Sequence, residues 1–347
     1  MAAKTPVRIL GLETSCDETA AAVVEDGGKI LSNVIATQAD LHAKYGGVFP
    51  EMASRQHIRT IHAVVEQALQ QAHLALENID AIAVTQGPGL PGSLVVGVNY
   101  AKGLALASGL PLLGINHLEA HIYSAWLASP EQDSVLPEPQ FPLLALLVSG
   151  GHTELDLMTD HLTYRQLGAT RDDAAGEAFD KVARLLHLPY PGGPSIQKAA
   201  SDGNPQAYRF PRARLEGEWD FSFSGLKTAV LRMVRQIEQT PGRLPVEDLA
   251  ASFQTAVVDV LVSKTILAAQ KCQAREILVA GGVSANRALR EAFVSQKSFP
   301  VHIPPLSLCT DNAAMVACAG YYHFINGRRD TLDFDVKPNW RLVKTEL

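Results

Sequence analysis

Two histidines four residues apart, His117 and His121, stand in the segment HLEAHIYSAW at residues 117–126. Histidines at this spacing lie on one face of an α-helix, where they can share a metal ion. Asn116 is a favourable N-cap residue and apolar residues recur at helical spacing after it, so we expect a helix to begin here. Such a pair also occurs on the surface of ordinary amphipathic helices, and a third ligand is needed to decide between the two readings.

The glutamate inside this segment argues against a zinc peptidase. In the H-E-x-x-H motif of such enzymes, the glutamate directly follows the first histidine and acts as the general base. Glu119 comes one position later. At about 100° per residue it points about 200° away from His117, so it faces away from the imidazole pair. The pattern keeps a metal site but lacks the base that peptide hydrolysis requires.

Two polar turns at the ends of apolar segments offer groups that bind nucleotides. The first, TSCDET at residues 14–19, carries the carboxylates Asp17 and Glu18 among three hydroxyl groups. The second, VSGGHTE at residues 148–154, places Ser149 and two glycines after another apolar run, and glycines let backbone N–H groups approach an anion closely. Taken singly, the first turn is better explained as an ordinary polar hairpin, and a Gly-Gly turn such as the second is weak evidence for a binding site.

A third turn joins an apolar strand to a helix in EILVAGGVSANRALREAF, residues 276–293. We expect Ser284 to cap this helix and Asn286 to stand on its first turn, where it can contact a ribose or a base edge. Helix capping explains Ser284 fully but explains Asn286 less well. Three such turns in one chain predict a nucleotide-binding cleft between two domains.

Three other positions have a structural explanation, and for two of them, Asp180 and Asp311, a functional explanation competes with it. Asp180 is either a solvated helix charge beside the i, i+4 pair Glu177 and Lys181, or part of a site. Ser224 is most simply a helix cap. Asp311 stands where an acidic capping residue belongs, and the same carboxylate could serve as a metal ligand.

The elements that must position these residues follow a repeated plan. Residues 7–37 read as two apolar strands around a polar turn and then a third strand after DGG, and a similar design returns at residues 141–160, which suggests a duplication. Between them lies a Gly/Pro loop followed by a helix that we expect Ser93 to cap and Gly109 to end. This alternation of strands and helices predicts an α/β fold.

Length and composition predict about two domains, since the chain has 347 residues, of which 47% are hydrophobic and 19% charged. The segment ASPEQDSVLPEPQ at residues 128–140 is the expected linker. We expect one domain to comprise residues 1–128 together with about 308–347, and the other to comprise residues 129–307.

Charge, cysteine spacing and the distribution of apolar residues limit the classes of protein to which the chain can belong. The net charge of −6 and the pI of about 6.0 show no overall excess of positive charge, which argues mildly against a nucleic-acid partner. Such a partner would have to bind to local basic patches. Four widely spaced cysteines without a C-x-x-C predict neither a zinc ribbon nor a disulfide scaffold. The chain shows neither a signal peptide at its N-terminus nor a run of about 18 apolar residues, so we expect a cytoplasmic protein without a membrane partner.

Ten motifs, in order, closely resemble the TsaD family of tRNA N6-adenosine threonylcarbamoyltransferases over about residues 7–341. They are LETSCDETAAAV, GGVFPEMASRQH, GPGLPGSLVVG, HLEAH, LLVSGGHTEL, DDAAGEAFDK, PYPGGP, DFSFSGLKTA, GGVSANRALR and CTDNAAM. The resemblance implies an actin-like, Hsp70-like ATPase (ASKHA) fold of two related domains around a nucleotide-binding cleft. It also implies transfer of a threonylcarbamoyl group from threonylcarbamoyl-adenylate to N6 of the adenosine 3′ to the anticodon, position 37, with release of AMP. The tRNAs concerned read codons that begin with A.

The resemblance also implies site residues. By the family pattern, His117, His121 and Asp311 coordinate one divalent metal ion, Fe²⁺ or alternatively Zn²⁺. The implied substrate contacts are Leu147, Val148, Ser149, Gly150, Gly151, Asp180, Gly193 and Asn286. Many relatives carry an aspartate four residues beyond the position of Gly193, where this chain has Gln197, so that contact is in question.

For the chemistry, we expect the metal to polarise the carbamoyl carbonyl and Glu18, or Asp17 beside it, to accept the amine proton. A metallopeptidase, a nucleotide kinase or ATPase, and a non-catalytic nucleotide-binding scaffold are the alternatives, because one fold hosts many chemistries. The resemblance further implies two protein partners, the shorter paralogue TsaB and the ATPase TsaE, in addition to tRNA.

Overall fold

The computed structural model describes residues 6–128, 140–213, 218–239 and 241–343 of the chain. These fall into two compact units, one made of residues 1–138 and 304–347 and the other of residues 139–303. The predicted linker at 128–140 lies almost entirely outside the described residues.

The first unit is built on a five-stranded sheet in the order β3-β2-β1-β4-β5. Its strands are β1 (Arg8–Glu13), β2 (Glu18–Glu25), β3 (Lys29–Thr37), β4 (Ala81–Gly87) and β5 (Leu112–Asn116). The predicted meander is confirmed, since β2 pairs antiparallel with both β1 and β3. Strands β1, β4 and β5 run parallel, so their carboxyl ends lie along one edge of the sheet.

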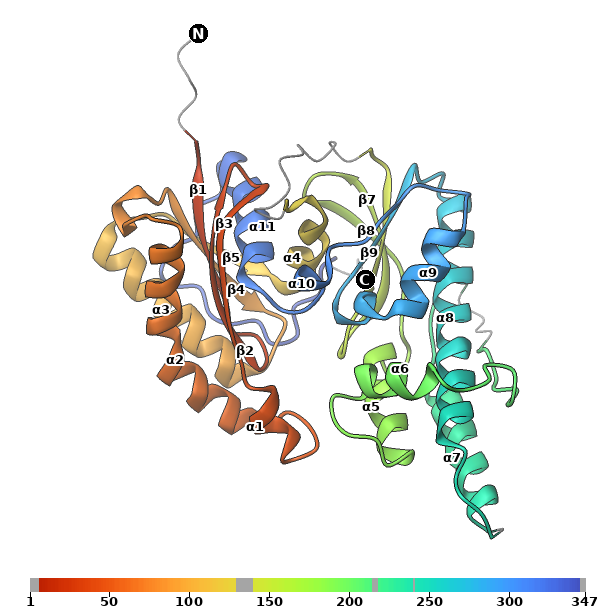
Figure 1. The fold of residues 1–347 in the computed structure, drawn as a ribbon. Helices are drawn as coiled ribbons and strands as arrows, with labels where there is room; N and C mark the ends of the chain where they lie inside the picture. The colour runs from red at the N-terminus through yellow and green to blue at the C-terminus, as the bar shows by residue number, and fades with distance from the viewer. Residues whose placement is uncertain (1–5, 129–139, 214–217, 240, 344–347) are drawn as a thin grey trace. The chain divides into compact units, whose positions relative to one another are not determined.

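Helices cover both faces of this sheet. Its helices are α1 (Ala39–Ala43), α2 (Pro50–Gln71), α3 (Pro91–Ser108), α4 (His117–Tyr123), α10 (Leu306–Cys309) and α11 (Ala313–Ile325), with 3₁₀ turns η1 (Leu76–Asn78) and η2 (Ser124–Trp126). Apolar residues of α2 and α3 form one core with the sheet, while α11 packs on the opposite face (Figure 1). Helix α4 packs against α11, so the histidine segment and the segment after Asp311 lie in one layer.

The second unit repeats the sheet order as β8-β7-β6-β9-β10. Its strands are β6 (Leu143–Val148), β7 (Thr153–Asp160), β8 (Thr163–Ala169), β9 (Glu276–Ala280) and β10 (Val301–His302). As in the first unit, the central strand has an antiparallel neighbour on one side and a parallel neighbour on the other. The common strand order and strand directions agree with the duplication that the similar design of residues 7–37 and 141–160 suggested.

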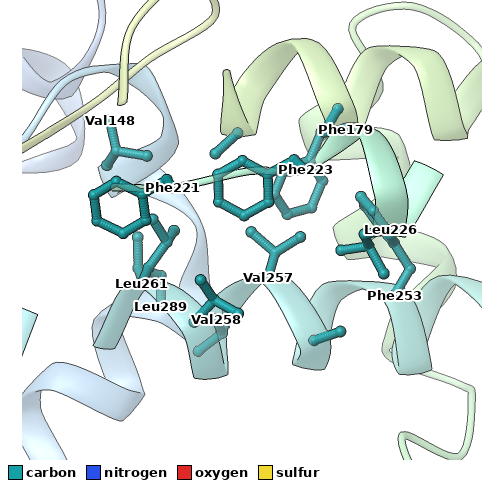
Figure 2. Close-up of a cluster of buried hydrophobic side chains, with 14 of the residues drawn as sticks. Val148, Phe179, Phe221, Phe223, Leu226, Phe253, Val257, Val258, Leu261 and Leu289 are labelled. Atoms are coloured by element: carbon teal, nitrogen blue, oxygen red, sulfur yellow. The ribbon is translucent and has the colours of Figure 1, made fainter. Parts of the chain in front are cut away.

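The helices of the second unit are α5 (Ala175–Leu185), α6 (Gly192–Ala200), α7 (Ser224–Glu238), α8 (Val246–Lys271) and α9 (Arg287–Ser295), with a 3₁₀ turn η3 (Gly282–Ala285). A core of aromatic and aliphatic side chains, including Phe179, Phe223, Phe253 and Val257, packs helices α5, α7 and α8 onto the sheet (Figure 2). Helix α8 is long and apolar enough to span a membrane, but 67% of its most apolar stretch is buried within the protein. Such burial is typical of a core helix.

Local capping predictions had mixed outcomes. The helix beginning at His117 and the stop at Gly109, which adopts a left-handed conformation, are confirmed. The caps predicted at Ser93, Ser224 and Ser284 are wrong. The Ser93 hydroxyl donates to the Cys16 carbonyl instead.

The other two helices are capped by different residues. At α7, Asp172 accepts hydrogen bonds from the backbone N–H groups of Phe223 and Ser224, so the cap comes from a distant segment. At α9, Asn286 is the N-cap and accepts from the backbone N–H of Leu289. Ser284 lies instead in the 3₁₀ turn that precedes this helix.

Candidate metal centre and substrate-binding turns

The two histidines lie at the carboxyl edge of the first sheet, directly after β5. The Asn116 side chain caps α4 by accepting hydrogen bonds from the backbone N–H groups of Leu118 and Glu119. This cap fixes the first turn of the helix and so the direction of His117. The imidazole rings of His117 and His121 lie 4.7 Å apart between centroids, and both are buried.

Asp311 lies beside this pair although it is almost two hundred residues away in sequence. Its Oδ1 is 3.2 Å from Nε2 of His121 and 3.5 Å from Nε2 of His117. One ligand atom from each of the three residues falls within 4.8 Å of the others. The interpretation of Asp311 as a helix cap is wrong, because Asn312 caps α11 by accepting from the backbone N–H of Met315.

The three side chains fit a divalent cation. Among the described residues, Nδ1 of His121 has no hydrogen-bond partner and Nε2 has only its contact with Asp311, although the ring is only 1% exposed. Burial lowers the pKa of His117, but the charges of Asp311 and Glu13 outweigh it and raise that pKa to about 9. The cluster therefore favours a positive charge, and two imidazole nitrogens with one carboxylate suit Zn²⁺ or Fe²⁺.

Sequence reasoning missed Glu13, the last residue of β1. Its carboxylate is fully buried, and Oε2 lies 3.0 Å from Nδ1 of His117. The same oxygen accepts a 2.6 Å hydrogen bond from the hydroxyl of Thr85 on β4. The strand order brings these groups together, since β1, β4 and β5 end at the same edge. The signal available in the sequence was a carboxylate that directly follows the apolar run of residues 9–12.

Asp17 ends the turn that joins β1 to β2, and Glu18 is the first residue of β2. Burial is the largest influence on Glu18 and raises its pKa, and the negative charges of Asp311 and Asp17 raise it further, to about 9. A hydrogen bond from Thr37 to its Oε1 opposes this shift. The buried ring of His57 on α2 holds the turn, with Nδ1 2.8 Å from Thr19 Oγ1 and Nε2 3.0 Å from the Cys16 carbonyl oxygen.

Glu119 faces away from the imidazole pair, as the helical geometry predicted. Its Oε2 lies 2.7 Å from Nε2 of His323 on α11. A carboxylate held in this way is not placed to act as the base of a peptidase. The structure therefore agrees with the argument against peptide hydrolysis.

The substrate contacts implied by the resemblance lie in the second unit. Leu147 and Val148 are buried at the end of β6, and the turn after them carries Ser149, Gly150 and Gly151. The Ser149 carbonyl accepts from the backbone N–H of Gly176 on α5. A Cβ atom built on Gly150 or Gly151 would meet no protein atom within 4 Å, so the backbone of the turn is open on that side.

Asp180 and Gly193 are connected through the start of α6. Oδ1 of Asp180 accepts a 2.8 Å hydrogen bond from the backbone N–H of Gly192. A Cβ on Gly193 would also meet no protein atom within 4 Å. One oxygen of Asp180 therefore holds the start of α6 in place, and the backbone at Gly193 beside it is open.

Asn286 and Gln197 both contribute to the start of α9. Besides capping the helix, Asn286 donates a 2.8 Å hydrogen bond from Nδ2 to Gln254 Oε1. Oε1 of Gln197 accepts a 2.6 Å hydrogen bond from the backbone N–H of Arg287. Gln197 thus holds α6 against α9.

The repeated sheets define an ASKHA-type, ATPase-like fold, here with a two-histidine, one-aspartate cluster at the edge of one sheet. Among solved structures, HypF in a phosphate- and nucleotide-bound form shares this fold with a TM-score of 0.60 and 13% identity, covering 93% of this chain and 57% of HypF. The chain belongs to the TsaD family, since the model of that family, described as tRNA N6-adenosine threonylcarbamoyltransferase, matches residues 29–318.

Curated relatives carry the same description. The tRNA N6-adenosine threonylcarbamoyltransferase of Dehalococcoides mccartyi is 56% identical, over 96% of this chain and 98% of the relative. The enzyme of the same name from Thermomicrobium roseum is 55% identical, over 98% of both chains.

Proposed function

We propose that this protein transfers the threonylcarbamoyl group of threonylcarbamoyl-adenylate to N6 of adenosine 37 in tRNAs that read codons beginning with A. Membership of the TsaD family supports the reaction class. The single structural observation that carries the proposal is the meeting of His117, His121 and Asp311 within 4.8 Å. A non-catalytic scaffold would not need such a set.

These three residues would hold one divalent cation, Fe²⁺ or Zn²⁺, which supplies Lewis-acid polarisation of the carbamoyl carbonyl when bound. The turn from Leu147 to Gly151, with Asp180, Gly193 and Asn286, binds the adenylate. In this turn the open backbone of Gly150 and Gly151 supports the assignment, because exposed N–H groups suit an anionic ligand.

In the transfer step, N6 of the adenosine attacks the carbamoyl carbon and a new N–C bond forms. The bond from that carbon to the phosphate oxygen breaks, and AMP leaves with the electron pair. The amine proton passes to the carboxylate of Glu18, with Asp17 as the alternative acceptor. The attacking nitrogen is a weak nucleophile because its lone pair is delocalised into the purine, so positioning supplies much of the rate.

We also propose that the protein acts with the paralogue TsaB and the ATPase TsaE. A net charge of −6 supports shared binding of tRNA, in which partner surfaces add positive charge. The proposed compartment is the cytoplasm.

The test is reconstitution. The purified chain, its partners, threonylcarbamoyl-adenylate and unmodified tRNA are mixed, and the modified nucleoside is measured by mass spectrometry. We expect product with the wild-type chain and a loss of at least about a hundredfold with His121→Ala or Asp311→Ala, because each removes a metal ligand. No product with the wild-type chain, or full activity in both variants, would overturn the proposal.

A further inference from the structure

We propose that Glu119 is a positioning residue, which holds helix α4 and both of its ligand imidazoles in place by binding His323 on α11. The inference rests on the proposed metal site. Glu119 lies inside the H-x-x-x-H segment but takes no part in the chemistry proposed above, and the inference gives this glutamate a role.

The contact joins the two segments that carry the three ligands. Glu119 lies between His117 and His121 on α4, and its Oε2 is 2.7 Å from Nε2 of His323. His323 lies in the last turn of α11, the helix that begins two residues after Asp311. Both partners are largely buried, with side-chain exposures of 7% and 14%. Removing one partner of a buried charged pair is strongly destabilising. The contact between Glu119 and His323 therefore restricts how α4 can move relative to α11.

The network continues from His323 back to the strand that leads into α4. Nη1 of Arg328 lies 3.5 Å from Nδ1 of His323, and Nη2 donates 2.8 Å hydrogen bonds to the Gly114 carbonyl and to Oδ2 of Asp330. That carboxylate oxygen accepts from the backbone N–H of Gly114, also at 2.8 Å. The chain of contacts thus leaves α4 through Glu119 and returns to β5, which directly precedes α4.

Such a closed network suits a short helix. Helix α4 has only seven residues, so its own hydrogen bonds cannot fix its direction. Further along the same seam, the ring of Tyr123 stacks on Tyr322 with centroids 4.7 Å apart, and Sγ of Cys318 lies 3.4 Å from the Tyr123 carbonyl oxygen. Because Glu119 lies on the side of α4 opposite the ligands, it can hold the helix without competing for the cation.

The test measures Zn²⁺ affinity and the visible spectrum of the Co²⁺-loaded chain, using the full-length protein. We expect Glu119→Ala and His323→Ala to weaken Zn²⁺ binding by about 10- to 100-fold, as is typical when outer partners of metal ligands are removed. Glu119→Gln should stay within about threefold of the wild type, because the amide oxygen still accepts from His323. Combining Glu119→Ala with His323→Ala should weaken binding no further than either alone.

A matched control exists on α2, where His62 and Glu66 form an exposed pair 3.5 Å apart. Glu66→Ala should leave both readouts unchanged. If Glu119→Ala fails to fold, Glu119→Asp keeps the charge but falls short of His323 by one methylene, and it should weaken Zn²⁺ binding and alter the Co²⁺ spectrum. Wild-type affinity in folded His323→Ala and in folded Glu119→Ala, or in Glu119→Asp where Glu119→Ala does not fold, would overturn the inference. Equal binding by the wild type and His121→Ala would instead overturn the proposed metal site itself.

Discussion

The carboxylate of Glu13 lies 3.0 Å from Nδ1 of His117, at the edge of the sheet where β1 and β5 end. It also accepts hydrogen bonds from the hydroxyl of Thr85 and the backbone N–H of Ser15, so both of its oxygens are held. A carboxylate in this position keeps the proton of a neutral imidazole on Nδ1. The other nitrogen, Nε2, then faces Asp311 as a ligand atom, in the arrangement common to metal-bound histidines.

Replacement of Glu13 should therefore weaken metal binding. We expect Glu13→Ala to lower Zn²⁺ affinity by about 10- to 100-fold, because the ring of His117 loses the partner that fixes its tautomer and orientation. Competition against a chromophoric chelator measures the affinity. Glu25→Ala removes a carboxylate of the same sheet that bonds Arg8 and Lys29 instead, and it should bind Zn²⁺ normally. Unchanged affinity in Glu13→Ala would contradict this role.

The contrast between Glu13 and the two histidines shows what local sequence can reveal. Helical spacing alone predicted that His117 and His121 share a face, because that relation depends on neighbours in the chain. Asp311 was paired with them only through the family resemblance, since no local pattern shows contacts made across the fold. The serine caps failed for a similar reason, as the hydroxyl of Ser93 found a tertiary partner in the Cys16 carbonyl.

Glu18 should make stability depend on pH in a defined direction. Its pKa is about 9 in the folded chain, against 4.5 as the ordinary value, so the folded state holds this proton more tightly than the unfolded state. The contribution of Glu18 to the free energy of unfolding is thus favourable below about pH 4.5 and is lost as pH rises toward about 9. In chelator, Glu18→Gln should gain stability relative to the wild type between pH 5 and pH 8, as measured by urea unfolding. A constant difference across this range would show that the carboxyl group does not titrate there.

The protonation state of Glu18 should also make the rate of transfer depend on pH. Glu18 must lose its proton before it can accept one from N6, so the single-turnover rate should rise with pH up to about 9 at most. A cation held at Asp311 offsets the negative charge of that residue and moves the rise to lower pH. Glu18→Gln should reduce the rate by about 10²- to 10⁴-fold and remove this dependence. A variant with the wild-type rate would exclude Glu18 as the proton acceptor and leave Asp17.

The open backbone of the Ser149 turn leads to a prediction about substrate affinity. A side chain at Gly151 meets no protein atom within 4 Å of its Cβ, and the residue does not adopt a left-handed conformation. Gly151→Val should therefore leave the fold and Zn²⁺ affinity intact, while the added methyl groups obstruct the approach of the adenylate. We expect the KM for threonylcarbamoyl-adenylate to rise on the order of tenfold, about 1.4 kcal/mol. An unchanged KM would remove this turn from the proposed substrate site.

A pair of glycine substitutions separates close packing from helix propensity in the first unit. A Cβ on Gly11 of β1 would lie 2.3 Å from the Ala313 carbonyl oxygen and 2.8 Å from the Ala317 backbone nitrogen. Both atoms belong to the backbone of α11, so Gly11→Ala must push that helix off the sheet. We expect a loss of about 1–3 kcal/mol in the free energy of unfolding.

Gly103→Ala is the matched control. Gly103 is exposed within α3, where a Cβ meets no atom within 4 Å, and alanine should stabilise the chain by about 0.5–1 kcal/mol. Denaturant unfolding at one pH compares the two variants with the wild type. Because α11 begins two residues after Asp311, the displaced helix in Gly11→Ala should also weaken Zn²⁺ binding, whereas Gly103→Ala should bind as the wild type does. Equal stability of the two variants would mean that α11 can shift without cost, and the rigid placement of Asp311 would then need another cause.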